Sequence, residues 1–412
     1  MPKPSGDSVD KPRVLILSPE APWPMHGGGA IRTASLVEYF GRRASTDLIL
    51  FHERGHPHPP VPANVLQRVD FIELPPHRRD PLSRALRNLR RYSSGTPPLL
   101  DRFSGFEHQL NAIVSGRQYD LAIVEHFWCA PYATLLRPIA GELWLDLHNL
   151  ESEWHQTLAR AAPLPHRAVL ARFARACRHM ERELLPLFDL LLVPSDRDAA
   201  SVREISPAAP TLLYPNALEW IAQPPRNEQH VIAFTGNLEY QPNIDAVRFF
   251  RRDVWPSLRR AHPQLRWRII GRNPRAVERI VRGDESIELV GPVDDAIAEL
   301  ARAKVSVVPV RAGSGTRLKI LEAWAAGTPV VSTSVGAQGL DAVPGLDLQI
   351  ADNPRAFVDT ISALLSSSDQ SVRQSASGRR LYERRFTWPY AWSLLSACAS
   401  ETISRLQSLY TG

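Results

Sequence analysis

A glycine-containing turn between an apolar run and a helix-forming run carries the residues of this chain best suited to chemistry. The apolar residues 305–310 give way to Gly313, Ser314 and Gly315, and a helix is predicted to begin near Thr316. Backbone N–H groups and the positive end of the helix dipole converge at such a turn, which suits a phosphate. Two cationic side chains, Arg317 and Lys319, lie at the same helix start, where they oppose the dipole unless an anion binds.

Glu322 follows Lys319 by three residues and is therefore predicted on the same helix face. Its carboxylate could accept hydrogen bonds from sugar or ribose hydroxyls while Lys319 holds phosphate. An ordinary surface Lys–Glu pair after a tight turn has the same spacing, so both interpretations remain open.

The N-terminal half offers a second group of candidates. Gly27, Gly28 and Gly29 follow the first apolar run, 13–18, and let backbone approach a ligand closely, although a flexible turn explains them equally well. Arg32, in the helix that follows, could meet phosphate or an acceptor.

Two histidines are predicted at the carboxyl end of the first sheet, where ligands bind in open parallel sheets. His148 follows the apolar run 143–147, and the pair Glu125 and His126 comes just after the run 121–124 and could face the same ligand. A histidine that caps the next helix is the alternative for His148.

The elements that must position these residues alternate between strand and helix along the chain. Apolar runs predict strands near 13–18, 46–51, 69–73, 121–124, 143–147, 190–193, 231–235, 266–270, 287–290, 305–310 and 329–332. The polar, proline-rich segment 222–228 has the composition of a linker. We therefore predict two doubly wound parallel-sheet domains that face a central cleft.

Composition supports a folded protein of more than one domain. The chain has 412 residues, 44% of them hydrophobic and 22% charged, which is too apolar for a disordered protein and too long for one core. Its three cysteines, Cys129, Cys177 and Cys398, lie far apart, which indicates a reducing compartment. No apolar run approaches the roughly 18 residues that span a bilayer, so we expect a cytoplasmic location.

The net charge is +6, and all but four of the 49 basic residues are arginines. No nucleic-acid recognition motif accompanies this charge, so no nucleic-acid partner is expected. Residues 77–91 hold six arginines against one aspartate, with Leu82, Leu86 and Leu89 at helical spacing. A solvated helix face and peripheral contact with the anionic inner face of a membrane both fit this segment.

Residues 313–331 resemble the nucleotide-sugar signature of the group 1, or family 4, glycosyltransferases, whose fold is the two-domain GT-B arrangement. Further segments agree in order and spacing, namely 27–29, 146–149, 193–195, 214–216, 235–237, 242–243, 270–272 and 289–293. The resemblance implies an acceptor-side Rossmann-like domain over 1–217, a nucleotide-sugar domain over 218–386, and a C-terminal helix in 387–412 that crosses back to the first domain.

The resemblance also assigns roles to residues. It implies catalytic roles for His148, Lys319 and Arg317, and an N-domain site formed by Gly28, Gly29, Arg32 and His126. It implies donor binding by Gly313, Ser314, Gly315, Thr316, Glu322, Gly236, Asn237, Arg272 and Val290. The sequence departs from the family where Ser314 replaces an acidic residue, and where Asn237 and Pro242 replace an arginine and a lysine. The phosphate-binding charge is therefore expected from Arg317 and Lys319.

We therefore expect a glycosyltransferase of the hexosyl type that uses a nucleotide-diphosphate sugar, with UDP as the expected carrier, and a glycan or lipid-linked acceptor of surface polysaccharide synthesis. The resemblance implies that the transfer retains the anomeric configuration. The only Asp-x-Asp triplet, Asp196-Arg197-Asp198, lies in the N-terminal half and away from the predicted diphosphate site, so neither a metal nor another cofactor is expected. A non-catalytic nucleotide-sugar-binding subunit and a sugar-nucleotide epimerase on the same scaffold remain as alternatives.

Overall fold

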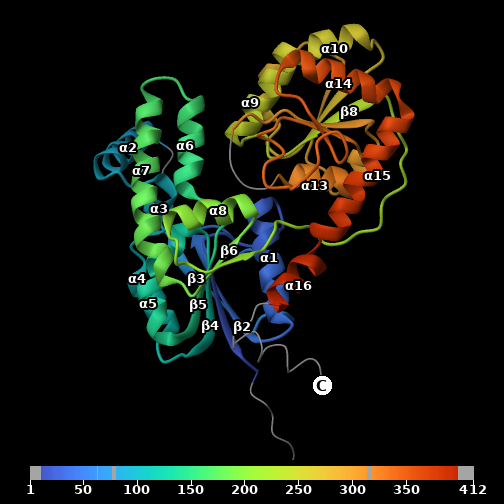
Figure 1. The fold of residues 1–412 in the computed structure, drawn as a ribbon. Coiled ribbons are helices and arrows are strands. Elements are labelled where there is room, and N and C mark those ends of the chain that lie inside the picture. The colour runs from blue at the N-terminus through green and yellow to red at the C-terminus, as the bar shows by residue number, and fades with distance from the viewer. Residues whose placement is uncertain (1–10, 63, 77–79, 313–316, 398–412) are drawn as a thin grey trace, which may run out of the picture. The chain divides into compact units, whose positions relative to one another are not determined.

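The computed structural model describes residues 11–62, 64–76, 80–312 and 317–397. The chain divides into two compact units, an N-terminal domain of residues 1–214 with 392–412 and a C-terminal domain of residues 215–391 (Figure 1). The boundary predicted from sequence was 217/218. Each domain is described by itself below.

The N-terminal domain is built on a parallel sheet with strand order β3-β2-β1-β4-β5-β6-β7. Its central strands are apolar on both faces, as expected where helices cover a parallel sheet on both sides. The strands are β1 (Arg13–Ser18), β2 (Ser45–Glu53), β3 (Arg68–Leu74), β4 (Tyr119–Glu125), β5 (Ala140–Asp146), β6 (Leu190–Val193) and β7 (Thr211–Leu213). The strand order reverses between β1 and β4, which is the position where ligands bind in doubly wound folds.

The helices of this domain connect successive strands. They are α1 (Gly28–Gly41), α2 (Pro81–Ser94), α3 (Pro98–Phe103), α4 (Glu107–Val114), α5 (Ala133–Leu136), α6 (Glu151–Ala161), α7 (His166–Leu184) and α8 (Asp196–Ile205), with 3-10 turns η1 (Phe127–Tyr132), η2 (Arg137–Ile139) and η3 (Leu185–Leu187). Helices α6 and α7 pack against each other as a hairpin (Figure 1).

The C-terminal domain repeats the design with the parallel order β10-β9-β8-β11-β12-β13, which reverses between β8 and β11. Its strands are β8 (Val231–Thr235), β9 (Arg266–Ile270), β10 (Ile287–Gly291), β11 (Val305–Val308), β12 (Val330–Ser332) and β13 (Gln349–Ile350). Its helices are α9 (Gln241–Phe249), α10 (Trp255–Ala261), α11 (Arg275–Val281), α12 (Ala296–Ala301), α13 (Leu318–Ala325), α14 (Pro354–Ser366) and α15 (Ser368–Arg385). Helix α13 packs on α12 and α15, and α14 packs on α10 (Figure 1).

The last described helix, α16 (Trp388–Ser396), ends in contact with α1 of the N-terminal domain. The indole of Trp392 donates to the Ser35 carbonyl at 3.2 Å, and the hydroxyls of Tyr39 and Ser396 lie 2.9 Å apart. These contacts with α1 cover aromatic surface of α16 that would otherwise be exposed to solvent. None of the helices in the described ranges is long and apolar enough to cross a bilayer.

The structure confirms the predicted fold class and corrects several predicted elements. The predicted strands lack β7 and β13, which have only three and two residues. The helical segment 241–261 is not continuous, because the π-helical turn Phe250–Val254 interrupts it between α9 and α10. Pro256, at the start of α10, lacks the N–H group that would continue a regular α-helix.

Two glycines bring loops together at the carboxyl end of the C-terminal sheet. Gly271 follows β9 with φ 152°, and a Cβ on it would lie 1.7 Å from the carbonyl oxygen of Gly236, which follows β8. The amide of Gly271 donates to the Gly291 carbonyl at 2.7 Å, which fixes β10 to the same edge. Only a residue without a side chain fits at Gly271.

We predict that Gly271→Ala destabilises the C-terminal domain more than Gly283→Ala does. Both glycines have positive φ, but a Cβ on Gly283 would meet nothing within 4 Å. Left-handed strain alone costs about 1–2 kcal/mol, and the clash at Gly271 adds an overpacking cost of about 1–3 kcal/mol. Urea unfolding followed by tryptophan fluorescence measures both, and equal losses would contradict the close approach of Gly271 and Gly236.

Candidate functional site

The C-terminal domain gathers polar side chains where its strand order reverses. Thr235 and Gly236 come from the end of β8, and Lys319 and Glu322 come from α13, which follows β11. This position is where open parallel sheets bind ligands.

Lys319 lies at the centre of this group. Its Nζ donates a hydrogen bond to Asn243 Oδ1 at 2.7 Å and lies 4.4 Å from the centroid of the Phe234 ring. A Cβ on Gly236 would lie 3.0 Å from the same nitrogen, so the absence of a side chain at Gly236 leaves room for the ammonium. The residue is only 9% exposed, which excludes the alternative of an ordinary surface Lys–Glu pair.

The environment of Lys319 disfavours its positive charge. Burial, with a contribution from the nearby charge of Arg317, lowers the pKa of Lys319 to about 7, and the charge of Glu322 opposes this shift in part. An anion placed beside Nζ would restore the charged form. In the free domain the charge of Lys319 is therefore only partly offset by its neighbours, and a bound anion could complete the compensation.

Glu322 lies one helical turn beyond Lys319 and is half-buried. The Thr235 hydroxyl donates to Glu322 Oε2 at 3.2 Å, which joins β8 to α13. Burial raises the pKa of Glu322, and the Thr235 hydrogen bond and the Lys319 charge counteract this.

Asn243 connects Lys319 to the loop after β8. While its Oδ1 accepts from Lys319, its Nδ2 donates to the Asn237 carbonyl at 2.7 Å. This second bond fixes which end of the amide faces the ammonium. In the segment where the family carries cationic residues, this chain therefore uses a neutral amide to position Lys319.

The family resemblance assigns Arg272 and Val290 to donor binding, and both residues lie along the same edge of the C-terminal sheet. Arg272 follows β9 and is exposed, and its carbonyl accepts from the Leu238 amide at 2.9 Å. Val290 lies half-buried in β10. The structure brings these residues and Asn237 to one edge of the sheet, and their contact with a nucleobase stays a prediction.

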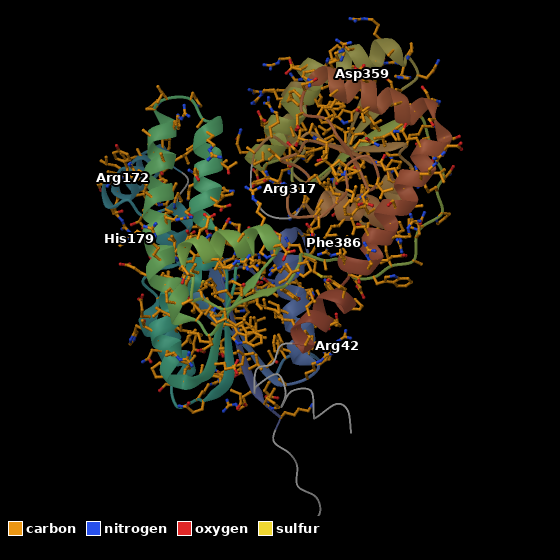
Figure 2. All side chains as sticks on the ribbon, viewed as in Figure 1. Arg42, Arg172, His179, Arg317, Asp359 and Phe386 are labelled. Carbon is orange, nitrogen blue, oxygen red and sulfur yellow. The ribbon has the colours of Figure 1, made fainter. Side chains whose placement is uncertain are left out.

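The segment before α13 is described only in part. Gly313, Ser314, Gly315 and Thr316 lie outside the described residues. Arg317 is half-buried at the N-cap position of α13, which begins at Leu318 (Figure 2). Burial lowers the pKa of its guanidinium, and its role in phosphate binding stays a prediction.

In the N-terminal domain, the structure corrects the interpretation of Arg32. Its guanidinium bonds both carboxylate oxygens of Asp146, with Nε 2.9 Å from Oδ1 and 2.7 Å from Oδ2, and it also donates to the Tyr214 carbonyl. Arg32 is only 2% exposed. Because a buried carboxylate needs a partner, Arg32 serves as the internal counter-ion of Asp146 instead of meeting phosphate or an acceptor.

His148 lies beside this ion pair. Its Nε2 is 2.8 Å from Glu125 Oε2 and 3.4 Å from Asp146 Oδ2. Burial lowers the pKa of His148, but the two carboxylates outweigh it and raise the pKa to about 9. The imidazole is therefore cationic at neutral pH, and the alternative of a helix cap is wrong because α6 begins at Glu151 with Leu150 as its N-cap.

His126 provides a neutral imidazole against this cation. Its ring stacks on His148 with centroids 3.5 Å apart and on Trp128 with centroids 4.2 Å apart. Burial and the His148 charge hold the pKa of His126 well below its usual value. Its backbone has φ 62°, which is strained for a residue with a side chain.

The glycine turn after β1 meets His126. A Cβ on Gly29 would lie 3.3 Å from His126 Nε2, while Gly28 is the first residue of α1. Within the described residues, His126 Nε2 and Glu125 Oε1 are buried and have no hydrogen-bond partner. The structure thus brings Gly29, His126 and His148 together, and leaves polar atoms that a ligand hydroxyl could satisfy.

Glu125, Asp146 and His148 place three potential metal ligands within 4.8 Å of one another, a group found in a search limited to the described residues. Arg32 bonds both oxygens of Asp146, and His148 is protonated between the carboxylates. In this arrangement the positive charges of Arg32 and His148 offset the two carboxylates, so the group forms an ion-pair cluster. The expectation of no metal stays a prediction.

Sequence reasoning placed Glu125 with His126 at a strand end but did not select Thr235, Asn243 or Asp146 as site residues. Asp146 and Glu125 were recognisable as carboxylates at the ends of adjacent apolar runs, next to the selected histidines. The role of Asn243 depends on the orientation of its amide, for which the sequence carries no signal.

Comparison with known proteins defines the class of fold. The chain is similar in structure to a sucrose-phosphate synthase from Thermosynechococcus elongatus, with a TM-score of 0.72 and 17% identity over 97% of this chain and 100% of that one. It is also similar to the Anabaena protein HepE solved in complex with UDP-glucose, with a TM-score of 0.60 and 13% identity over 97% and 100% of the two chains. These likenesses establish the GT-B fold.

Sequence comparison matches part of the chain to a known family. Residues 229–367, which lie in the C-terminal domain, match the family described as Glycosyl transferases group 1. The chain is 24% identical over 308 residues to a D-inositol 3-phosphate glycosyltransferase of Corynebacterium urealyticum, covering 66% of this chain and 69% of the relative. These matches confirm the predicted family and enzyme class.

A partial relative matches a shorter stretch. The chain is 30% identical over 159 residues to an exopolysaccharide phosphotransferase of Streptomyces coelicolor, covering 36% of this chain. The match spans only 16% of that relative's length.

We predict that His148→Gln weakens the N-terminal domain in a pH-dependent way. Because the folded pKa of about 9 lies above the ordinary 6.5, the stabilisation is complete below pH 6.5 and is lost as the pH rises through 9. The variant should lose about 3 kcal/mol of unfolding free energy below pH 6.5, and the loss should disappear above pH 9.

Urea unfolding over this pH range measures the effect. His179→Gln is the matched control, because this histidine is exposed on α7 (Figure 2) and should change little at any pH. A His148→Gln loss that does not vary with pH would contradict a cationic His148.

Proposed function

We propose that this chain transfers a sugar from a nucleoside diphosphate donor, with UDP as its carrier, to a hydroxyl of a glycan or lipid-linked acceptor. The observation that carries the proposal is the buried Lys319 ammonium beside Gly236, at the carboxyl edge of the sheet in the domain that matches the group 1 glycosyltransferases. UDP is favoured because structural neighbours were solved with UDP and UDP-glucose.

In this proposal the C-terminal domain holds the donor. Lys319 and Arg317 would bind the diphosphate and stabilise the negative charge that develops on the leaving group, without a metal ion. Glu322 would accept hydrogen bonds from the ribose hydroxyls, as the family resemblance implies. Thr235 and Asn243 would act as positioning residues, since they hold Glu322 and Lys319 in place.

The N-terminal domain is proposed to contribute His148 and the acceptor side. A cationic imidazole with a neutral imidazole stacked on it can donate to sugar oxygens and accept from hydroxyls. The buried atoms His126 Nε2 and Glu125 Oε1 support a polar ligand at this edge. Retention of the anomeric configuration and a role in surface polysaccharide synthesis are part of the proposal and rest on the family resemblance.

Two other functions would use the same donor site. A non-catalytic nucleotide-sugar-binding subunit would bind UDP-sugar without turnover on any acceptor. A sugar-nucleotide epimerase would convert the donor sugar without releasing UDP. Acceptor-dependent release of UDP distinguishes transfer from both.

We predict that Lys319→Ala lowers acceptor-dependent UDP release by about 10²–10³-fold, the usual cost of one lost donor at a developing negative charge. Glu322→Ala, which removes the proposed contact with the ribose, should also nearly abolish this release. Lys304→Ala is the matched control, because Lys304 pairs with Glu228 at 3.7 Å and should retain activity.

A thermal-shift screen of UDP-, GDP- and dTDP-sugars identifies the donor first. A ligand at 100 times its dissociation constant should stabilise the wild type by about 2.7 kcal/mol.

Circular dichroism checks that both variants remain folded. Turnover at the wild-type rate in Lys319→Ala and Glu322→Ala would remove the assignment. UDP-sugar binding without UDP release, tested with several acceptors, would favour the binding subunit.

A further inference from the structure

Helix α2 presents an inverted amphipathic pattern. Leu82, Leu86 and Leu89 are 71%, 60% and 65% exposed, and Tyr92 is 47% exposed, whereas Arg91 is buried. A helix on a water-soluble surface normally turns its apolar stripe inward. Here the leucines face outward, so the apolar stripe of α2 lacks cover among the described residues.

Specific contacts hold α2 in this orientation. Asp80 caps its first turn by accepting from the Ser83 amide at 2.8 Å, and Gly95 ends it in the left-handed conformation. Arg90 and Arg91 both bond Asp101 of α3 at 2.7 Å, and these two arginines lower the pKa of Asp101 against the effect of its burial.

The C-terminal end of α2 is fixed to α7. Arg172 donates from Nη2 to the Ser93 carbonyl at 2.9 Å, and its guanidinium carbon lies 5.4 Å from the centroid of the Tyr92 ring (Figure 2). Ionic and polar contacts thus anchor the inner face of the helix, and rotating the leucines inward would break them.

The charge of α2 indicates what covers the leucines. The helix contains four arginines and no acidic residue, and Arg90 has a side chain 77% exposed. A second copy of this chain docked by the same face would bring two arginine-rich helices together, which like-charge repulsion opposes. An anionic lipid surface complements both the charge and the leucines.

We propose that the exposed face of α2, formed by Leu82, Leu86 and Leu89, docks on an anionic bilayer. The leucines would enter the interface between headgroups and acyl chains, and the largely exposed side chain of Arg90 would meet the lipid phosphates. This docking surface belongs to the N-terminal domain and does not depend on the donor site. If the proposed function also holds, docking brings the acceptor-side domain to lipid-linked acceptors.

Vesicle co-sedimentation of the full chain tests the proposal. We expect at least about tenfold stronger binding to vesicles of equal parts phosphatidylcholine and phosphatidylglycerol than to phosphatidylcholine alone, weakening with salt. The triple variant Leu82→Ser, Leu86→Ser and Leu89→Ser should lose at least about tenfold in binding to the anionic vesicles.

The matched control replaces three exposed apolar residues of the C-terminal domain, Val343→Ser, Leu346→Ser and Val372→Ser, which are 53%, 51% and 66% exposed. It should bind vesicles like the wild type. An unchanged UDP thermal shift in the leucine variant shows that it is folded and that its donor site is intact, so loss of docking and loss of the donor site are told apart.

Several results would overturn the proposal. In the first, the wild type binds neither kind of vesicle, or binds both kinds equally. In the second, the leucine variant binds the anionic vesicles as strongly as the control variant does. A wild-type dimer in light scattering that the leucine substitutions dissociate would also overturn it, by assigning the face to a second copy.

Discussion

The buried ammonium of Lys319 is the interaction on which the C-terminal site depends. It is bonded to the neutral amide of Asn243, and in the described part of the chain no carboxylate forms a hydrogen bond with it. Burial of a charged group without a full counter-ion is energetically unfavourable. The pKa of Lys319 is therefore lowered to about 7, which means that the ammonium loses its proton more readily than usual. In the proposed function, a bound diphosphate supplies the missing negative charge.

The close packing at this edge follows from the same need. Gly236 leaves room for the ammonium, and Gly271 lets the loop after β9 approach the loop after β8. Thr235 fixes Glu322 from the strand side. The N-terminal domain uses the opposite solution, since Asp146 and Glu125 there surround Arg32 and His148 and raise the pKa of His148 to about 9. The C-terminal edge therefore leaves the charge of Lys319 without a full counter-ion, whereas the N-terminal edge holds an internal network of ion pairs.

Much of this arrangement could be predicted from the sequence because it depends on local patterns. Apolar runs separated by helical segments predicted both parallel sheets. The three-residue spacing of Lys319 and Glu322 predicted that they share one helix face. Arg32 was assigned wrongly because its partner Asp146 is distant in sequence and becomes adjacent only when β5 lies beside β4. The outward leucines of α2 fit a solvated face and a lipid-facing one equally in sequence, and only the contacts of Arg90 and Arg91 with Asp101 show which face is anchored.

Lysine side-chain NMR tests the central claim most directly, because the chain contains only four lysines, Lys3, Lys11, Lys304 and Lys319. With isotope-labelled lysine, the signal lost in Lys319→Ala identifies Lys319, and its titration gives the pKa without and with UDP. The account predicts a pKa of about 7 in the free protein and a rise of about one unit or more when UDP binds. A pKa near the ordinary 10.5 in the free protein, or one that UDP leaves unchanged, would contradict it.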